Sequence, residues 1–400
     1  MILTEQYIIS KSHPFYDECD HLCFQSKNIY NQGLYNVRQY YFENKTYLNY
    51  NANYYVTKDQ ECYTYLPTKV FCQTLKMVDR NFMSFFSLLK NKTVKNKIPK
   101  YLDKEKGRFI TIFPKQALSL REFKKSGKIH LSKTEILINT KIANFDQIKE
   151  VRVVPKLGFY VIEIVYEVKE KKHRDTGIVS SIDIGLNNLA TVTFNNGDNP
   201  LLINGRPLKS INQYYNKKKA KYQEKLKNKH TSRKIQKLTN KRNNKVKDYL
   251  HKASHALVNQ LVSKDVSTLV IGKNTSMKQD INMGRRNNQN FTQLPIFIFV
   301  DMLRYKCELQ GIKVVFTEES YTSKYSFFDG DFVPVLGDGD KPEPSGKRVR
   351  RGLYRTKEGK LVNADVNGSY NIMKKAIPNV EYTNGIEGLG VNPLLLNIKR

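Results

Sequence analysis

One acidic residue lies where its charge predicts chemistry. Residues 178–197, IVSSIDIGLNNLATVTFNNG, read as two apolar strands joined by a short bend, and Asp183 ends the first strand. A carboxylate on a central strand is costly unless a cation meets it, and a metal ion is the usual partner. Gly185 would let a ligand or another backbone approach closely. The alternative is an Asp on an edge strand that faces water.

Two known arrangements contain a strand, an Asp, a bend and a second strand: the ribonuclease H-like nucleases and the actin-like ATPases. The chain has 68 Lys and Arg against 37 Asp and Glu, a formal net charge of +31. A protein that holds a polyanion uses such a charge, whereas a nucleotide kinase does not need it. The later half also has no second Gly-rich phosphate loop. The composition therefore favours a nuclease.

Length and composition indicate a globular protein of two or three domains, because 400 residues at 40% hydrophobic content can form a real core. No apolar run approaches the ~18 residues that span a membrane. The first residues, MILTEQYIISK, lack the pattern of a signal peptide. We therefore expect a cytoplasmic protein without a membrane partner. Cys19 and Cys23 have helical spacing, which favours buried thiols over a zinc site.

The N-terminal part predicts strands interrupted by helices. Residues 1–10 read as one strand, 14–43 as a helix, and the apolar period after Pro67 as a second, strongly amphipathic helix. Residues 91–106 are rich in lysine and predict either a linker or a loop that contacts phosphate. From Gly107 the period becomes two, which predicts an antiparallel set closing into a small barrel. We assign 1–10 and 91–175 to this barrel and 11–90 to a helical insertion.

The C-terminal part predicts the order strand, strand, strand, helices, strand, helix, strand, which is typical of a ribonuclease H-like sheet. Between residues 206 and 252 lie seventeen Lys or Arg and only two acids. This density favours a helix that faces nucleic acid over one whose charges are merely solvated. An Asn- and Arg-rich loop follows the next strand. The predicted nucleic-acid-binding residues are Lys217, Lys218, Lys219, Arg233, Lys234, Lys241, Arg242, Arg285 and Arg286.

Four segments, in this order, carry a resemblance to a known family: SIDIGLNNLAT, LVIGKNTSMKQDINMGRRNNQNF, EESYTSKYSF and NADVNGSYNI. The chain resembles the transposon-associated TnpB (OrfB) family. Members of this family are encoded by insertion sequences and are related to type V CRISPR effectors. The resemblance implies an α+β multidomain protein, with a wedge-type β-barrel carrying a helical recognition insertion, followed by a ribonuclease H-like RuvC nuclease domain. It also implies guide RNA and target double-stranded DNA as partners.

The resemblance places two catalytic carboxylates at Asp183 and Asp365, but the third departs from the family pattern. The family usually has a Glu directly after the strand that reads LVIG, where this chain has Gly272 and Lys273. Glu318 and Glu319 stand at the end of the next strand, and Glu319, three residues before Thr322, matches a rearranged site better than Glu318. We expect Asp183, Glu319 and Asp365 to hold two Mg²⁺ or Mn²⁺ ions ~3.5–4 Å apart, with Glu318 as the alternative ligand.

The family's zinc ribbon is also altered. Its four cysteine positions fall at Ser326, Asp329, Arg355 and Glu358, none of which is a thiolate. We therefore expect no structural zinc. The predicted nuclease domain comprises 176–319 and 361–378, with basic helices at 206–263, a cysteine-free insertion at 320–360 and a C-terminal tail at 379–400.

Three functions remain open from the sequence. The first is an RNA-guided DNA endonuclease that cuts next to a short adjacent motif by two-metal hydrolysis. The second is an RNA-guided DNA-binding protein without nuclease activity, acting as a repressor or transposition regulator, which Gly272 favours. The third is a structural RNA-binding protein without a DNA target. Cleavage of a matching plasmid library separates the three.

Overall fold

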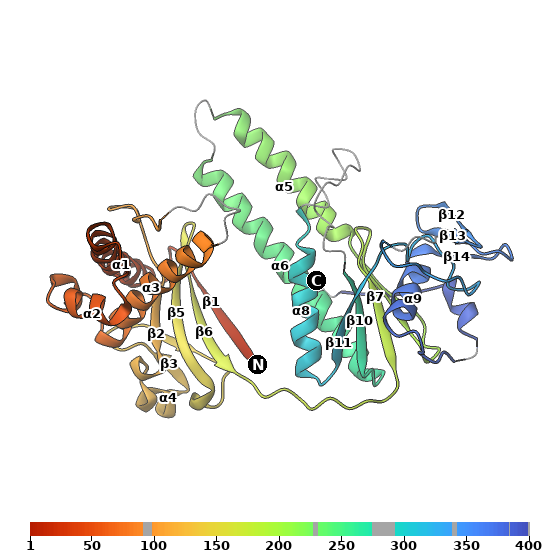
Figure 1. Ribbon diagram of the computed structural model, residues 1–400, viewed down its shortest axis with the longest axis horizontal. Coiled ribbons are helices and arrows are strands. Elements are labelled where there is room, and N and C mark those ends of the chain that lie inside the picture. Colours follow the sequence, from red (N-terminus) through yellow and green to blue (C-terminus); the bar gives the residue numbers. More distant parts are fainter. Residues whose placement is uncertain (91–97, 227–230, 274–292, 338–341, 384, 399–400) are drawn as a thin grey trace. The chain divides into compact units, whose positions relative to one another are not determined.

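The computed structural model describes residues 1–90, 98–226, 231–273, 293–337, 342–383 and 385–398. The chain divides into two compact units, Met1–Lys169 and Glu170–Arg400 (Figure 1). The architecture is mixed α+β in both units. Within the described ranges, every helix is too short or too polar to cross a membrane.

The first unit is built on an antiparallel sheet with the order β1–β6–β5–β2. Its strands are β1 (Ile2–Ile9), β2 (Thr111–Pro114), β5 (Ile148–Lys156) and β6 (Phe159–Glu167). A separate ribbon pairs β3 (Lys128–His130) with β4 (Leu137–Asn139). Within the described residues β1 and β2 are the outer strands, so hydrogen bonding does not close this sheet into the barrel that the sequence predicted.

Two helices, α1 (Tyr16–Asn44) and α3 (Thr68–Lys90), pack on this sheet. Helix α2 (Tyr50–Lys58) packs on α1 and α3, and α4 (Leu120–Ser126) packs on β3. The predicted stripe on α3 is buried, with Phe71, Leu75 and Val78 fully inside. Cys19 and Cys23 are buried free thiols on α1, as expected. The sequence did not predict α2, which begins where the Asn49 side chain accepts a hydrogen bond from the Ala52 amide.

The second unit contains a six-stranded sheet with the order β11–β10–β7–β8–β9–β15. Its strands are β7 (Val179–Asp183), β8 (Asn188–Phe194), β9 (Leu201–Asn204), β10 (Thr268–Lys273), β11 (Lys313–Glu318) and β15 (Leu394–Leu396). Strands β7, β10 and β11 run parallel, whereas β7, β8 and β9 form an antiparallel meander. Gly197 provides the positive φ of 81° for the turn between β8 and β9.

Helices cover both faces of this sheet. They are α5 (Arg206–Glu224), α6 (Arg233–Ser263), α8 (Ile296–Leu309) and α9 (Ala364–Ala376). Leu269 and Ile271 of β10 pack in one cluster with α6 and α8, whereas Val270 packs in another with α9. Because successive side chains of a strand point to opposite faces, α9 lies on one face and α6 with α8 on the other. Figure 1 shows α5 and α6 as a pair of long helices side by side.

Two segments complete the second unit. The region between β11 and α9 contains a small antiparallel sheet of β12 (Lys347–Arg350), β13 (Leu353–Arg355) and β14 (Leu361–Asn363). The tail after residue 378, for which the sequence predicted no regular structure, contributes β15, which pairs in parallel with β9. That prediction was wrong because three leucines at 394–396 supply the outer edge of β9 with a hydrogen-bonded partner, a contact between segments nearly two hundred residues apart.

Candidate active site

Asp183 ends β7 at the centre of the sheet, between β10 and β8. Its neighbour across the face is Gly368 of α9, where an added Cβ would lie 3.2 Å from Asp183 Oδ2. The missing side chain at residue 368 lets the helix backbone approach the carboxylate closely. Asp183 is therefore not the edge-strand residue facing open water that the sequence left as an alternative.

A buried group of hydroxyls fixes α9 on β7. Ser181 Oγ donates a hydrogen bond of 2.6 Å to the Ser369 carbonyl, and Ser369 Oγ donates one of 3.1 Å to the Ser181 carbonyl. Thr193 of β8 joins them, with its Oγ1 2.8 Å from Ser181 Oγ. All three side chains are buried. Because buried hydroxyls are costly without partners, these bonds favour a single placement of the helix over the strand.

Asp365 lies in the first turn of α9. Asn363 caps the helix by accepting hydrogen bonds from the Asp365 and Val366 amides at 2.9 and 3.2 Å. Asn188, at the start of β8, donates from Nδ2 to Asp365 Oδ2 at 2.8 Å. The Asn363 cap fixes the backbone of this turn, and the Asn188 amide orients the Asp365 carboxylate.

Glu319 lies directly over Gly272. Thr317 of β11 pairs with Gly272 of β10, and Glu319 follows one residue after the end of β11. An added Cβ at residue 272 would stand 3.0 Å from Glu319 Oε2 and 3.3 Å from Glu319 Cβ. The glutamate side chain thus occupies the space that a side chain at residue 272 would need. A side chain at residue 272 and the Glu319 side chain would therefore compete for the same space.

Glu318 has a different environment. Its carboxylate forms an ion pair with Lys375 of α9 and accepts a hydrogen bond from the Ser320 amide. Burial acts to raise the pKa of Glu318, but the hydrogen bonds from Lys375 and Ser320 outweigh it and lower the pKa. Lys375 also donates to the Ser320 and Pro334 carbonyls at 3.1 Å each. Glu318 therefore anchors the end of β11 to α9.

The three remaining acids interact electrostatically. Removal from water, with the nearby charges of Asp365 and Glu319, raises the pKa of Asp183 to about 8, and Arg348 opposes this. Burial and the charge of Glu318 raise the pKa of Glu319. Like charges gathered in a desolvated place favour protons or cations. Oxygen donors are the ligands that Mg²⁺ and Mn²⁺ prefer, so Asp183, Glu319 and Asp365 fit such an ion chemically.

Within the described ranges, no three His, Cys, Asp or Glu side chains lie close enough together to hold a metal ion.

Two of the four positions at which the family's zinc ribbon has cysteines, Ser326 and Asp329, are joined by a hydrogen bond. The Asp329 amide donates to Ser326 Oγ at 3.2 Å, and Asp329 Oδ2 accepts from the Lys357 amide at 2.9 Å. These bonds connect the loop after β11 to the turn after β13.

The predicted nucleic-acid-binding residues differ in their surroundings. Lys217, Arg233, Lys234 and Lys241 are exposed, and Lys218 and Lys219 are half-buried over Tyr214 and Tyr215.

Arg242, in contrast, is held by protein groups. It donates to Asn212 Oδ1 at 2.8 Å and to the Gln293 carbonyl at 2.7 Å, and burial lowers its pKa. It joins α5 to α6, which its sequence position could not reveal. Arg285 and Arg286 lie outside the described residues.

Three residues around the carboxylates were missed from the sequence. Asn188 orients Asp365, Gly368 makes room for Asp183, and Lys375 holds Glu318. Asn188 and Gly368 lie inside the segments SIDIGLNNLAT and NADVNGSYNI, five residues after Asp183 and three after Asp365. Their closeness in sequence to the two acids was a signal that could have identified them. Lys375 had no such signal, because its partner Glu318 lies 57 residues away in the sequence.

Comparison with known families identifies two regions of the chain. Residues 163–278 match the model of OrfB_IS605, described as a probable transposase. Residues 298–372 match the model of the Cas12f1-like TNB domain.

Among curated proteins, a TnpB-like protein of Methanocaldococcus jannaschii is 30% identical over 209 residues, covering 50% of this chain and 69% of that protein. The CRISPR-associated endodeoxyribonuclease Cas12f2 of a Micrarchaeota archaeon is 26% identical over 269 residues, covering 64% of this chain and 47% of that protein.

Solved structures share the fold at low sequence identity. The Cas12f1 chain of a complex with sgRNA and target DNA gives a TM-score of 0.54 at 16% identity, covering 90% of this chain and 82% of that one. The mini RNA-guided endonuclease Cas-phi3 gives a TM-score of 0.50 at 10% identity, covering 94% and 92%. At these identities the likeness concerns the fold alone.

Proposed function

The chain belongs to the TnpB (OrfB) family, and on this premise we propose that it is an RNA-guided DNA endonuclease that cleaves target DNA beside a short adjacent motif. The observation that carries the proposal is the position of Glu319 over Gly272. This chain has Gly272 where the family usually has a Glu, and the proximity of the Glu319 side chain to Gly272 supports Glu319 as the replacement. The chain thus retains three acids for the reaction.

Asp183, Glu319 and Asp365 would hold two divalent cations, Mg²⁺ or Mn²⁺. Bound there, such ions activate water and stabilise the leaving oxygen of a phosphodiester. The chain's own residues prepare the place. Asn188 occupies Oδ2 of Asp365 and so orients the other oxygen, and the ion pair of Glu318 fixes the backbone from which Glu319 extends. Because residue 368 is a glycine, α9 lies close to Asp183. The helix that carries Asp365 therefore packs directly against the strand that carries Asp183.

In this proposal the N-terminal region recognises nucleic acid and the C-terminal region cleaves DNA. Residues 1–175 form the wedge-type region, with 11–90 as its helical recognition insertion, and contact the guide RNA and the adjacent motif. Residues 176–319 and 361–378 form the RuvC-like nuclease domain. The strand order β9–β8–β7–β10–β11, with β8 antiparallel to its neighbours, supports a ribonuclease H-like fold. The exposed lysines and arginines of α5 and α6 contact phosphates.

The test compares Asp183→Ala with the wild type. Each protein is purified with its RNA, the RNA is sequenced, and a plasmid library carrying the matching target is challenged with Mg²⁺. We expect the wild type to cut and Asp183→Ala to lose cleavage by at least about a hundredfold, because a metal ligand is gone. Guide RNA binding should stay nearly intact, since in this proposal the carboxylate holds a metal ion and not the RNA.

The other outcomes assign the other functions. Protection of the target without cutting by the wild type would indicate an RNA-guided DNA-binding protein. Neither cutting nor protection would leave a structural RNA-binding protein. Equal loss of RNA binding and cleavage in Asp183→Ala would show that Asp183 is structural and that the site is wrongly placed.

A further inference from the structure

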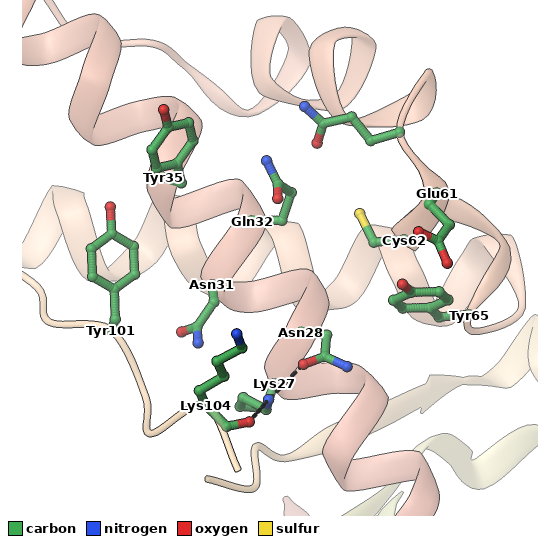
Figure 2. A pocket seen from close by; sticks show the side chains of 11 residues that line it. Lys27, Asn28, Asn31, Gln32, Tyr35, Glu61, Cys62, Tyr65, Tyr101 and Lys104 are labelled. Atoms are coloured by element: carbon green, nitrogen blue, oxygen red, sulfur yellow. Dashed lines mark hydrogen bonds between the residues drawn. The ribbon is translucent and has the colours of Figure 1, made fainter.

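The first unit contains a pocket that none of the carboxylate chemistry uses. It lies between α1, the 3-10 turn Glu61–Thr64 and the segment from residue 98 to 106, and its volume is about 580 Å³ (Figure 2). Pockets that take small molecules or single groups of a polymer have volumes of about 300–1,000 Å³. The size therefore suits one planar ring system with its attached groups.

Tyrosines line this pocket with their rings partly open. Tyr35 and Tyr101 are 51% and 44% exposed, and Tyr65 is half-buried on the opposite side. In Figure 2 the rings of Tyr35 and Tyr101 lie on one side of the pocket and Tyr65 on the other. Exposed aromatic rings beside cationic groups are the platforms on which unpaired bases stack.

A buried cation forms one wall. Lys27 is only 1% exposed, and its Nζ donates to Asn28 Oδ1 at 2.5 Å and to the Lys104 carbonyl at 2.6 Å. Within the described part of the chain no carboxylate pairs with it, and its Nζ also lies 4.0 Å from the centroid of the Phe24 ring. Burial, Arg108 and Lys104 lower the pKa of Lys27, while Asp103 opposes them. An incoming anion or acceptor would relieve this cost.

The opposite wall offers acceptors. Gln60 lines the pocket, and its Oε1 is buried with no hydrogen-bond partner in the described ranges. A buried acceptor without a donor is costly, which points to a group that a ligand supplies. Glu61 stands beside it and would repel a phosphate. The pocket therefore has an acceptor end at Gln60 and Glu61 and a cationic end at Lys27 and Lys104, as Figure 2 shows for the labelled residues.

We propose that this pocket binds one unpaired nucleotide, with its base against Tyr35 and Tyr101, the N–H groups of the base toward Gln60 and its phosphate toward Lys27 and Lys104. A nucleobase matches the whole set, because it combines a flat ring, edge donors and a neighbouring anion. The inference rests on the proposed function, in that the nucleotide belongs to a strand that the protein already holds.

The test uses the full chain freed of RNA, in EDTA, and single-stranded oligonucleotides with one central 2-aminopurine, made as RNA and as DNA. Affinity is measured by anisotropy and stacking by quenching of 2-aminopurine. We expect the double variant Tyr35→Ala, Tyr101→Ala to lose the quenching and to bind about tenfold more weakly, a size typical of one or two lost stacking contacts. The RNA and DNA arms show which strand supplies the nucleotide.

Matched variants make the result specific. Tyr40→Ala with Tyr55→Ala removes two exposed tyrosines that do not line the pocket, 38% and 67% exposed, and should leave binding and quenching unchanged. Tyr35→Phe with Tyr101→Phe keeps both rings and should quench like the wild type. Gln60→Leu keeps the bulk but removes the acceptor, and should weaken binding several-fold.

Two results would overturn the inference: wild-type quenching and affinity in the Tyr35→Ala, Tyr101→Ala protein, or the same loss in the Tyr40→Ala, Tyr55→Ala control. If either occurs while the wild type still binds oligonucleotides and cuts DNA, the pocket inference fails and the proposed function stands. A wild type that binds neither RNA nor DNA overturns both.

Discussion

At the scale of residues, the proposed site depends on a space that Gly272 of β10 leaves empty and that an acid from the neighbouring strand fills. Gly272 leaves the space over β10, and Glu319 fills that space from the end of β11. The adjacent Glu318 forms an ion pair with Lys375 of α9 instead. Two acids next to each other in sequence are therefore expected to differ completely in function.

Exchange of each glutamate for glutamine tests this difference. We expect Glu319→Gln to reduce DNA cleavage by at least about a hundredfold with little change in stability, since it loses a metal ligand. Glu318→Gln should keep cleavage within a few fold but lower the free energy of unfolding by about 1–3 kcal/mol, because Lys375 loses its charged partner. Plasmid cleavage and urea unfolding measure the two effects. The opposite pattern would assign the metal ligand to Glu318.

A methyl group at residue 272 should disturb the same place. The Cβ of Gly272→Ala would stand 2.8 Å from Ile372 Cδ1 and 3.0 Å from Glu319 Oε2. We expect cleavage to fall about tenfold or more and stability to fall by about 1–3 kcal/mol, because a tightly packed contact is overfilled. Gly388→Ala is the matched control, since its Cβ meets nothing within 4 Å. Unchanged cleavage in Gly272→Ala would mean that Glu319 does not need this position.

At the scale of elements, α8 is joined to α6 by the half-buried amine of Lys306. Lys306 donates to Ser254 Oγ at 2.7 Å and to the His251 carbonyl at 2.9 Å, and burial lowers its pKa to about 8. The ordinary pKa of a lysine is about 10.4, so the folded protein releases this proton first as the pH rises. The unfolded chain then binds more protons, and the stability of the fold increases with pH through this window.

This linkage predicts a measurable slope. Between pH 8 and 9.5 the wild type should gain about 1 kcal/mol in its free energy of unfolding relative to Lys306→Met, after allowance for solvent screening of a half-buried group. Urea unfolding of both proteins at the two pH values gives the difference. Parallel curves for the wild type and Lys306→Met would refute the assignment.

At the scale of the whole molecule, the net charge of +31 predicts that the proposed nucleic-acid binding depends on salt. Each lysine that contacts a phosphate releases counterions on binding, so affinity falls as salt rises. Lys217, Lys218 and Lys219 lie on α5, and nearby Tyr214 and Tyr215 support two of the amines. Arg242 is already bonded to Asn212 and Gln293, so its charge should contribute less to this dependence.

Exchange of Lys217, Lys218 and Lys219 for glutamine should flatten the plot of log affinity against log salt by about two to three units for guide RNA and target DNA. Arg121, Lys124 and Lys125 on α4 are exposed and provide a control triple with the same change of charge. Filter binding at several salt concentrations measures both slopes. An unchanged slope in the α5 triple, or equal flattening in the control, would show that α5 does not lie along the phosphates.

The sequence by itself determined the order of elements and the place of the first acid. The apolar stripe of α3, the β7–β8 pair around Asp183 and the strand and helix order of the second unit depend on local periodicity, which a single chain displays directly. The resemblance of four segments to the TnpB family predicted the second acid, Asp365, and the family itself. The same resemblance showed that Gly272 stands where the family usually has a Glu.

Only the tertiary structure decided how those residues meet. The position of Glu319 over Gly272, the hydrogen bond from Asn188 to Asp365 and the pairing of Lys375 with Glu318 all join distant strands and helices. The same holds for β15 beside β9, for the open sheet in the first unit and for Arg242. Strand register and the close approach of glycine backbones set these contacts, and neither is written in the pattern of any one segment.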